Sequence, residues 1–313
     1  MNVTRLDVGA PTALVTGATG GLGRPIALRL AQHGYRLFLH GRDSDRLAAL
    51  SAEVRAAGGA RPHMIRADFR DLKDVAALCE IVEDETERLD LIINNAGTGF
   101  AFEPDVPSGS QGMAPTFQVN YLAPYLIMHR LLGLMRGVEG SAILNIASLG
   151  QADLPEDLRQ VGRGPDPIVY GRSKLALIMA TRSLAEQLGE GGTAVYALHP
   201  GSMLDTNLTR SLLKRMPLWV GLCWRASRRL RPTVDAAAGF VVAVATERPR
   251  VRPSGAFWTA KKLGRAKPQA ADSGARDRLE AFSRDAVAPF LGRASQAADS
   301  SRAPATLSEA SSQ

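Results

Sequence analysis

Short, mainly apolar runs alternate with longer segments of helical periodicity along most of the chain. The runs that are typical of buried parallel strands occupy residues 12–16, 36–40, 63–67, 90–93 and 142–146. Helices are predicted between them, from about residue 26 and over 43–57 and 71–88. This alternation predicts an α/β fold in which helices flank a doubly wound parallel sheet in three layers.

The pattern changes at both ends of the chain. A polar leader, 1–11, precedes the first strand, and residues 12–292 are expected to form a single domain. Helices are expected from Tyr170 to Leu188 and over 233–246, with a last strand at 255–258. The Ala/Ser-rich tail, 293–313, lacks apolar periodicity and is expected to be disordered.

Composition excludes few classes of protein. The 313 residues are 45% hydrophobic and 22% charged, which is ordinary for a globular chain. Neither a signal peptide nor an apolar run of the ~20 residues that span a bilayer is apparent, so we expect a cytoplasmic protein. The net charge of +7 is scattered, which disfavours nucleic acid as a partner. Cys79 and Cys223 are isolated and predict no metal site.

A glycine-rich turn links the first strand to the first helix. Four glycines fall within residues 17–23, directly after the strand. Glycines allow a tight turn, and the helix N-terminus offers free amides to a pyrophosphate. A plain strand-to-helix turn is the alternative. The cofactor contacts expected here are Thr16, Gly17, Gly21, Leu22 and Gly23.

The end of the second strand bears on the choice of cofactor. Folds that select NAD normally place a carboxylate there for the ribose 2′-hydroxyl, whereas an arginine accommodates a 2′-phosphate. This chain has Gly41-Arg42, with no carboxylate before Arg42. We therefore predict that NADP (NADPH) is preferred over NAD. The alternative is that Arg42 is simply solvated at a loop tip.

Tyr170 and Lys174 stand four residues apart at the start of a predicted helix, so they share one face. A free phenol, with a pKa near 10, is a poor base at neutral pH, and a nearby ammonium lowers that pKa. The pair is thus a candidate general acid/base, although such spacing also arises by chance.

Five motifs occur in order: Thr16-Gly17-x-x-x-Gly21-x-Gly23, Asn94-Asn95-Ala96-Gly97, Ser148, Tyr170-x-x-x-Lys174 and Pro200-Gly201. Over roughly residues 12–290 the chain resembles the classical short-chain dehydrogenases/reductases. Within them it is most similar to the retinol-dehydrogenase-like branch, on stretches such as His40-Gly41-Arg42-Asp43 and His199-Pro200-Gly201. The resemblance implies a Rossmann-type domain and oxidoreductase activity.

The resemblance also implies residue roles. Tyr170 would exchange a proton with the substrate oxygen, Ser148 would polarise that oxygen, and Lys174 would hold the nicotinamide ribose and lower the Tyr170 pKa. Asn120 would hold a water in a proton relay to Lys174, unless it is bonded only for structure. Further cofactor contacts would be Asp68 at the adenine, and Asn94, Asn95, Ala96, Gly97, Pro200, Gly201 and Thr206.

Three departures from the family pattern stand near the expected site. Ala147 precedes Ser148 where many relatives have a second serine. A polar insert at 151–167 lengthens the interval to Tyr170 and is expected to form a loop near the cleft mouth. Thr206 is one residue later than usual after Pro200-Gly201, so it is a candidate only.

Residues 203–232, rich in large apolar side chains, are the expected substrate lid. An apolar lid favours an apolar carbonyl or alcohol substrate. The sequence therefore predicts NADP(H)-dependent interconversion of carbonyl and alcohol. A non-catalytic NADP-binding regulator of the same fold is the alternative, and a peripheral membrane contact of the lid and a homo-oligomer are left open.

Overall fold

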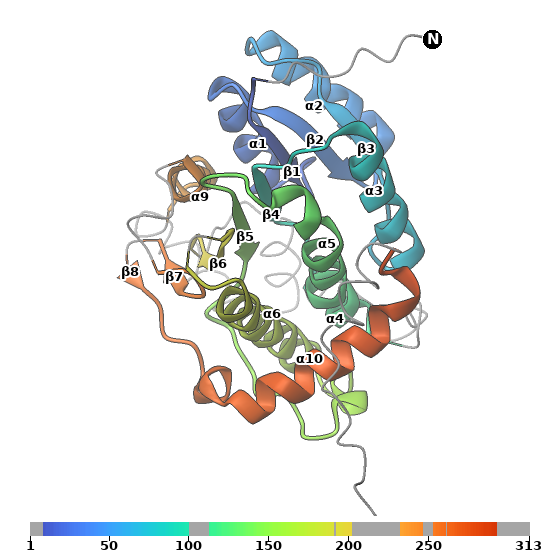
Figure 1. The fold of residues 1–313 in the computed structure, drawn as a ribbon, viewed down its shortest axis with the longest axis vertical. Helices are drawn as coiled ribbons and strands as arrows, with labels where there is room; N and C mark the ends of the chain where they lie inside the picture. The colour runs from blue at the N-terminus through green and yellow to red at the C-terminus, as the bar shows by residue number, and fades with distance from the viewer. Residues whose placement is uncertain are drawn as a thin grey trace, which may run out of the picture.

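The computed structural model describes residues 9–99, 113–190, 192–201, 232–246, 253–260 and 262–292 (Figure 1). Within these ranges one eight-stranded sheet has the order β3-β2-β1-β4-β5-β6-β7-β8. The strands are parallel except for β8, which pairs antiparallel with β7. Their bounds are β1 Thr12–Val15, β2 Arg36–Gly41, β3 His63–Arg66, β4 Leu91–Asn94, β5 Ala142–Ile146, β6 Ala194–His199, β7 Phe257–Thr259 and β8 Lys262–Leu263. The predicted doubly wound α/β fold is confirmed.

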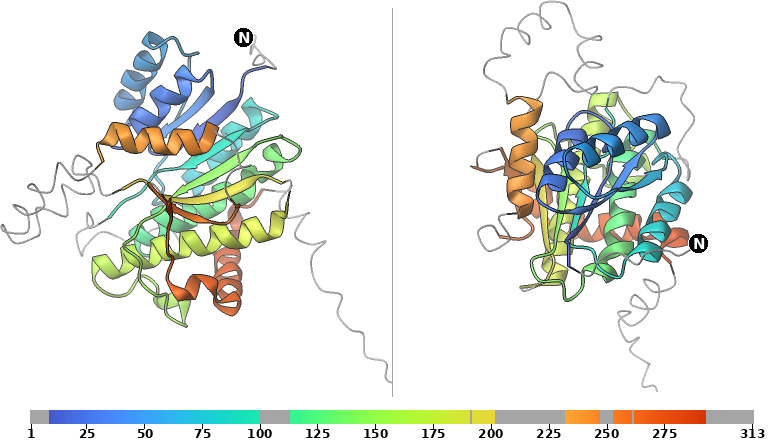
Figure 2. Two further views of the ribbon diagram at one scale, coloured as in Figure 1. Left: turned by 90° about the vertical axis from the view of Figure 1, so that its left-hand side faces the viewer. Right: turned by 90° about the horizontal axis from the view of Figure 1, so that it is seen from above.

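Helices cover both faces of the sheet and complete three layers (Figure 2). One layer consists of α1 (Gly23–Gln32), α2 (Ser44–Ala56) and α9 (Val234–Thr246). The other consists of α3 (Leu72–Glu85), α4 (Pro115–Phe117), α5 (Ala123–Leu131), α6 (Asp166–Leu188) and α10 (Ser273–Val287). A single π-helical turn, Gln118–Leu122, joins α4 to α5.

Two hydrophobic cores form because successive strand residues face opposite sides of the sheet. Leu14 and Ile92 belong to the core beneath α3, α5 and α6, whereas Val15 and Ile93 belong to the core beneath α1, α2 and α9. These side chains are at most 1% exposed. The uninterrupted apolar runs of the sequence thus correspond to strands that are buried on both faces.

Local side-chain hydrogen bonds determine where the helices begin and end. Asp43 caps α2 by accepting hydrogen bonds from the backbone N–H groups of Asp45 and Arg46. The predicted helix 71–88 is shorter in the structure, because Thr86 is extended and its hydroxyl accepts a hydrogen bond from the Arg88 N–H. The remaining predicted helices agree closely with the observed ones.

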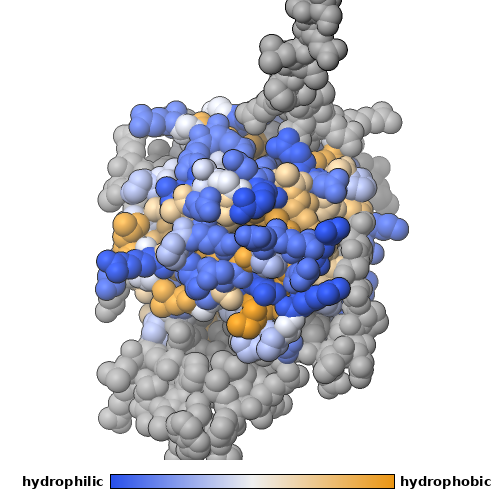
Figure 3. Space-filling view, turned by 90° about the horizontal axis from the view of Figure 1, so that it is seen from below, coloured by the Kyte–Doolittle hydropathy of each residue, from blue (hydrophilic) through white to orange (hydrophobic). Residues whose placement is uncertain are grey.

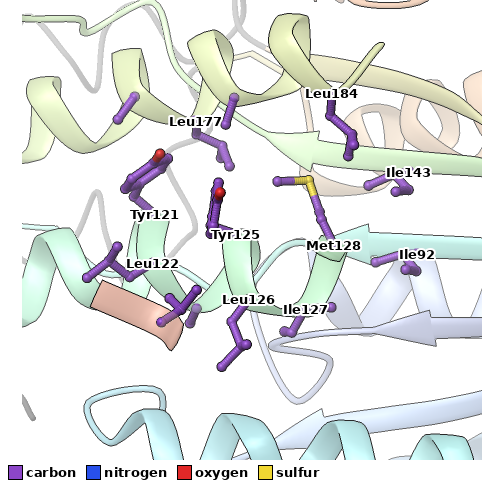
Figure 4. Close-up of a cluster of buried hydrophobic side chains, with 14 of the residues drawn as sticks. Ile92, Tyr121, Leu122, Tyr125, Leu126, Ile127, Met128, Ile143, Leu177 and Leu184 are labelled. Atoms are coloured by element: carbon purple, nitrogen blue, oxygen red, sulfur yellow. The ribbon is translucent and has the colours of Figure 1, made fainter. Parts of the chain in front are cut away.

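The C-terminal helix α10 packs against α6 and the π-helical turn. The Tyr121 hydroxyl, in that turn, is hydrogen-bonded to the Ser283 hydroxyl, and the Tyr125 hydroxyl donates a 2.8 Å bond to Glu280. Figure 4 shows both tyrosine rings among the buried side chains between α5 and α6. The sequence patterns predicted neither α10 nor strands β6 and β8.

Several expectations concern residues outside the described ranges. These are the first eight residues of the leader, residues 203–231 of the lid, Thr206 among them, and the tail. In the described ranges, no helix has both the length and the hydrophobicity needed to cross a membrane. The described part of the face in Figure 3 is mainly hydrophilic, with apolar residues scattered among polar ones.

Candidate active site

The glycine-rich turn lies at the carboxyl end of β1, where the sheet order reverses between β1 and β4. Gly17 has a φ of +62°, which a side chain rarely tolerates. A Cβ on Gly23 would come within 2.2 Å of the Gly17 carbonyl oxygen, so this turn cannot form without glycine there. Leu22 precedes α1 and makes no side-chain cap, which leaves the helix N-terminus to a ligand.

Thr16 joins the glycine-rich turn to the end of β4. Its hydroxyl oxygen accepts hydrogen bonds from the backbone N–H groups of Asn95 and Ala96, at 3.0 and 2.9 Å. The Asn95 side-chain amide donates in return to the carbonyl oxygens of Thr16 and Gly17, at 2.9 and 3.1 Å. Two motifs that are 79 residues apart in sequence are therefore joined by hydrogen bonds at the point where the strand order reverses.

Asn94, the last residue of β4, belongs to a buried chain of hydrogen-bonded polar side chains. Its amide donates a 2.8 Å bond to Asn145 of β5, whose own amide donates to the Thr181 hydroxyl of α6. The Oδ1 atom of Asn94 is buried and has no hydrogen-bond partner within the protein. Asn94 is therefore buried beneath the cofactor edge and bridges β4, β5 and α6.

A pocket of about 290 Å³ opens beside Arg42, at the ends of β2 and β3. It is lined by Thr19, Arg42, Asp43, Arg46, Asp68 and Arg70. All three guanidinium-bearing residues are exposed. Arg46 and Arg70 were not predicted from sequence, although Arg46 stands four residues after Arg42 at the start of α2. The pocket has the chemistry of an anion site, which fits the prediction made from Arg42.

Asp68 shares this pocket with Arg70 in a two-pronged ion pair. The Arg70 guanidinium donates to both carboxylate oxygens, at 2.6 to 3.1 Å. Burial opposes the effect, but the hydrogen bonds and charge of Arg70 hold the pKa of Asp68 below its usual value. Asp68 is therefore an ionised acceptor at the end of β3, as an adenine contact requires.

Ser148, Tyr170 and Lys174 come together at the carboxyl edge of β5. Ser148 lies two residues beyond β5, and its side chain is hydrogen-bonded to Tyr170. The Ser148 hydroxyl also accepts a 3.1 Å bond from the Gly150 N–H. Lys174 follows Tyr170 by one turn of α6, with its Nζ 5.8 Å from the centre of the tyrosine ring. The predicted pairing of Tyr170 and Lys174 on one helix face is present.

The pKa of Tyr170 differs from the sequence-based expectation. Burial raises it above the usual phenol value, and the hydrogen bond with Ser148 only partly opposes that rise. The neighbouring Lys174 is 6% exposed and donates a 2.8 Å bond from Nζ to the Ile146 carbonyl oxygen. Burial lowers the pKa of Lys174 itself to about 8.

Asn120 occupies the π-helical turn and is fully buried. Its side-chain amide donates to the Thr98 carbonyl at 2.7 Å and to the Ser173 hydroxyl at 3.1 Å, and its oxygen accepts from the Thr98 N–H at 2.7 Å. A Cβ on Gly97 would lie 3.3 Å from the Asn120 oxygen and 3.6 Å from Lys174 Nζ. Asn120 therefore holds the 97–98 segment beside Lys174. Its role in holding a relay water stays a prediction.

The loop that connects Ser148 to Tyr170 is held by Arg172. Its guanidinium donates to the backbone carbonyls of Asp153, Val161 and Arg163, the last at 2.6 Å. Gly171 permits the close packing, because a Cβ there would lie 2.8 Å from the Ala152 nitrogen. Residues 151–165 of the predicted insert thus lie before α6, and its last two residues already belong to that helix, which begins at Asp166.

The Pro200-Gly201 motif follows β6 at the same edge of the sheet. Gly201 has a φ of +109°, and a Cβ there would lie 2.4 Å from Pro232. The two ends that flank the expected lid therefore meet. His199, just before them, has a lowered pKa because of burial and the nearby charge of Lys174. The described ranges contain no group of His, Cys, Asp or Glu side chains that could hold a metal ion.

The residues at this edge fit a nicotinamide dinucleotide. The uncapped N-terminus of α1 suits the pyrophosphate, and the arginine-lined pocket suits an anionic adenosine end. Asn95, Ala96 and Gly97 lie between that pocket and Lys174, along the path that a dinucleotide would take. Ser148, Tyr170 and Lys174 stand at the far end of this path.

Comparisons with known proteins agree with this geometry. The sequence profile of the family described as short chain dehydrogenase matches residues 11–217. Retinol dehydrogenase 14 of Mus musculus is 34% identical over 68% of this chain and 68% of its own length. A Streptomyces protein named provisionally as a daunorubicin C-13 ketoreductase is 35% identical, over 61% of this chain and 66% of its own.

A solved structure supports the same assignment. The angucycline C-6 ketoreductase LanV, crystallised with bound NADP, superposes with a TM-score of 0.62 at 28% identity, covering 80% of this chain and 93% of the other. The chain therefore belongs to the short-chain dehydrogenase family, in the branch of the retinol dehydrogenases, and is an oxidoreductase.

Proposed function

We propose that this protein is an NADP(H)-dependent oxidoreductase that interconverts a carbonyl and an alcohol on an apolar small molecule, with Tyr170 as the general acid/base. One arrangement carries the proposal. Ser148, Tyr170 and Lys174 meet at one end of a cofactor-binding edge whose other end is a pocket with three arginines.

The arginine pocket supports NADP over NAD. The 2′-phosphate is a dianion, and guanidinium groups bind phosphate through paired, charge-assisted hydrogen bonds. Arg70 is held by Asp68, whereas Arg46 makes only a looser ion pair with Asp43, with 3.7 Å between Nε and Oδ2. No ion pair of Arg42 occurs among the described residues. Two guanidinium groups are therefore placed to receive the phosphate, and Asp68 with Arg70 borders the adenine.

The chemistry divides between the cofactor and the side chains. When bound, the nicotinamide supplies the hydride for carbonyl reduction or accepts it in alcohol oxidation. Tyr170 donates its hydroxyl proton to the carbonyl oxygen, or removes the proton in the reverse direction. Ser148, already hydrogen-bonded to Tyr170, is placed to bind the same oxygen and polarise it.

Lys174 has a binding role at this site. Its ammonium lies within reach of the cofactor path beside Gly97, and the Ile146 carbonyl fixes its direction. A positive charge there favours an anionic cofactor and, with the substrate in place, the phenolate form of Tyr170. Asn120 supports it by holding the 97–98 segment.

The surface around Tyr170 supports an apolar substrate. Leu149, which directly follows Ser148, is 56% exposed. Large apolar side chains at the mouth of a site favour substrates that bury them. The named relatives point the same way, since retinol and daunorubicin appear in their names. The cytoplasmic location expected from sequence stays a prediction.

A panel of apolar aldehydes, ketones and alcohols, followed at the nicotinamide absorbance with NADPH, NADP, NADH and NAD, tests the proposal. We expect turnover of at least one apolar carbonyl with NADPH and a higher kcat/KM than with NADH. NADPH binding without turnover of any member would instead support a non-catalytic NADP-binding regulator.

A further inference from the structure

His40 lies at the carboxyl end of β2 with both ring nitrogens hydrogen-bonded to backbone groups. The Gly17 N–H donates to Nδ1 at 3.2 Å, and Nε2 is 3.1 Å from the Ala67 carbonyl oxygen. The ring stacks on Phe69 with centroids 4.1 Å apart and planes 2° apart. His40 is only 2% exposed, so its side chain is built into the sheet edge between β1 and β3.

The two partners allow a single tautomer. A backbone N–H can only donate and a carbonyl can only accept, so Nδ1 must be bare and Nε2 must carry the proton. A protonated ring would place an N–H against the Gly17 N–H. The pKa of His40 is lowered to about 4, mainly by burial and further by the charge of Arg42. The hydrogen bond to Ala67 and the carboxylates of Asp68 and Asp74 only partly oppose this lowering. The imidazole is therefore neutral at physiological pH.

The His40 side chain provides a hydrogen-bond acceptor for the Gly17 N–H, which the backbone of β2 does not provide. Backbone bonds already join Ala18 N–H to the His40 carbonyl and Ala67 N–H to the Gly41 carbonyl. Any residue at position 40 could keep these. The Gly17 N–H, however, lies in a turn with positive φ, and the imidazole is its acceptor. Without an acceptor, that N–H loses its fixed direction and the turn its fixed conformation.

We propose that His40 is a positioning residue for cofactor binding, which holds the glycine-rich turn and the Ala67–Asp68 segment at the spacing that a dinucleotide requires. The inference rests on the proposed binding of NADP(H). It assigns to His40 no contact with the cofactor. Its effect is expected on the affinity for cofactor, and kcat at saturating NADPH should be unchanged.

Two isosteric substitutions separate the two hydrogen bonds. The side-chain oxygen of asparagine takes roughly the place of Nδ1, whereas the side-chain amide of glutamine takes roughly the place of Nε2. His40→Asn can thus still accept from Gly17, and His40→Gln can still donate to Ala67. The exposed His33, at the end of α1, supplies a matched control as His33→Gln.

The positioning role of His40 is tested by NADPH dissociation constants, measured by fluorescence titration on the full chain. We expect His40→Gln to bind NADPH about tenfold more weakly than wild type, His40→Asn to stay within about threefold, and His33→Gln to be unchanged. In steady-state assays the KM for NADPH should follow these values. Wild-type affinity in His40→Gln with an unchanged melting temperature would overturn the proposal.

A measurement on the wild type covers the case in which the variants do not fold. Nitrogen-15 NMR of the imidazoles at pH 5.5 should show His40 neutral with its proton on Nε2. A protonated His40, or a proton on Nδ1, would overturn the inference.

If wild type binds NADPH but none of the variants changes the affinity, only the role of His40 fails. If wild type binds no NADPH, the proposed function fails as well.

Discussion

The Nζ atom of Lys174 donates a 2.8 Å hydrogen bond to the backbone carbonyl oxygen of Ile146, the last residue of β5. This bond joins the helix that carries Tyr170 to the strand that leads to Ser148. It directs a buried ammonium to the sheet edge, where Nζ lies 5.8 Å from the centre of the Tyr170 ring. Ser148, Tyr170 and Lys174 are therefore held in place by the fold itself, and the burial of Lys174 that this requires should have measurable effects.

Replacing Tyr170 by phenylalanine should abolish most turnover and spare cofactor binding. Tyr170→Phe keeps the ring and its packing but removes the only proton that the mechanism uses. We expect kcat to fall by about 10²- to 10⁴-fold, with the NADPH dissociation constant unchanged. The matched control is Tyr35→Phe, at the residue just before β2 and far from the carboxyl ends of the strands. This variant should keep the wild-type kcat. Retention of most activity by Tyr170→Phe would refute the assigned role.

The buried ammonium of Lys174 should lower the free energy of unfolding at neutral pH. Its depressed pKa of about 8, against a usual 10.5, corresponds to a cost on the order of 3 kcal/mol at neutral pH. Lys174→Met should therefore melt several degrees above wild type at pH 7. The unfolded chain binds more protons than the folded one between pH 8 and 10.5, so wild-type stability rises across this window and the difference shrinks. The exposed Lys73→Met should show no such change; a lower melting temperature for Lys174→Met would contradict the reasoning.

The same group should make cofactor binding depend on pH. The ammonium form, which attracts an anionic cofactor, predominates below about pH 8 and is lost above it. NADPH affinity of the wild type should thus weaken by up to about tenfold between pH 7 and 9. Isothermal titration of Lys174→Met should give weaker binding without that decline. Parallel pH profiles for the two proteins would show that another group is responsible.

Arg42 should discriminate between the two nicotinamide cofactors. Arg42→Gln removes a guanidinium from the pocket, which only the 2′-phosphate of NADPH would use. A charge-assisted bond of this kind is worth about 1.5–3 kcal/mol, so NADPH should bind about ten- to a hundredfold more weakly and NADH equally well. The control is Arg55→Gln, in the last turn of α2, whose first turn contains Arg46. Equal losses for both cofactors would remove the argument for NADP.

Arg172 should control the order of the loop beside Tyr170. Arg172→Ala deletes the hydrogen bonds that hold the carbonyls of Asp153, Val161 and Arg163. Amide hydrogen exchange over 151–164 should accelerate, and the KM of an apolar substrate should rise, with NADPH affinity unchanged. Arg182→Ala, which only loses a surface pair with Glu186 on the same helix, should leave the exchange as it is. Unaltered exchange in Arg172→Ala would mean that the loop is held by other contacts.

Strands β1 to β5 and β7, the glycine-rich turn and the Tyr170–Lys174 pair could be predicted from the sequence because each depends on local information. Apolar runs, helical spacing and conformational demands such as that of Gly17 are encoded within a few residues of the elements concerned. The resemblance to the short-chain dehydrogenases then implied that Ser148 shares one site with Tyr170 and Lys174.

The tertiary structure alone decided how these residues behave, because burial and long-range contacts have no local signature. It brought Arg46 and Arg70 to the Arg42 pocket, seated α10 on Tyr121, and turned His40 toward Gly17 and Ala67. It also reversed the expected shift of the Tyr170 pKa. Spacing places an ammonium near a phenol, but the free energy of desolvation depends on every atom that folding packs around the pair.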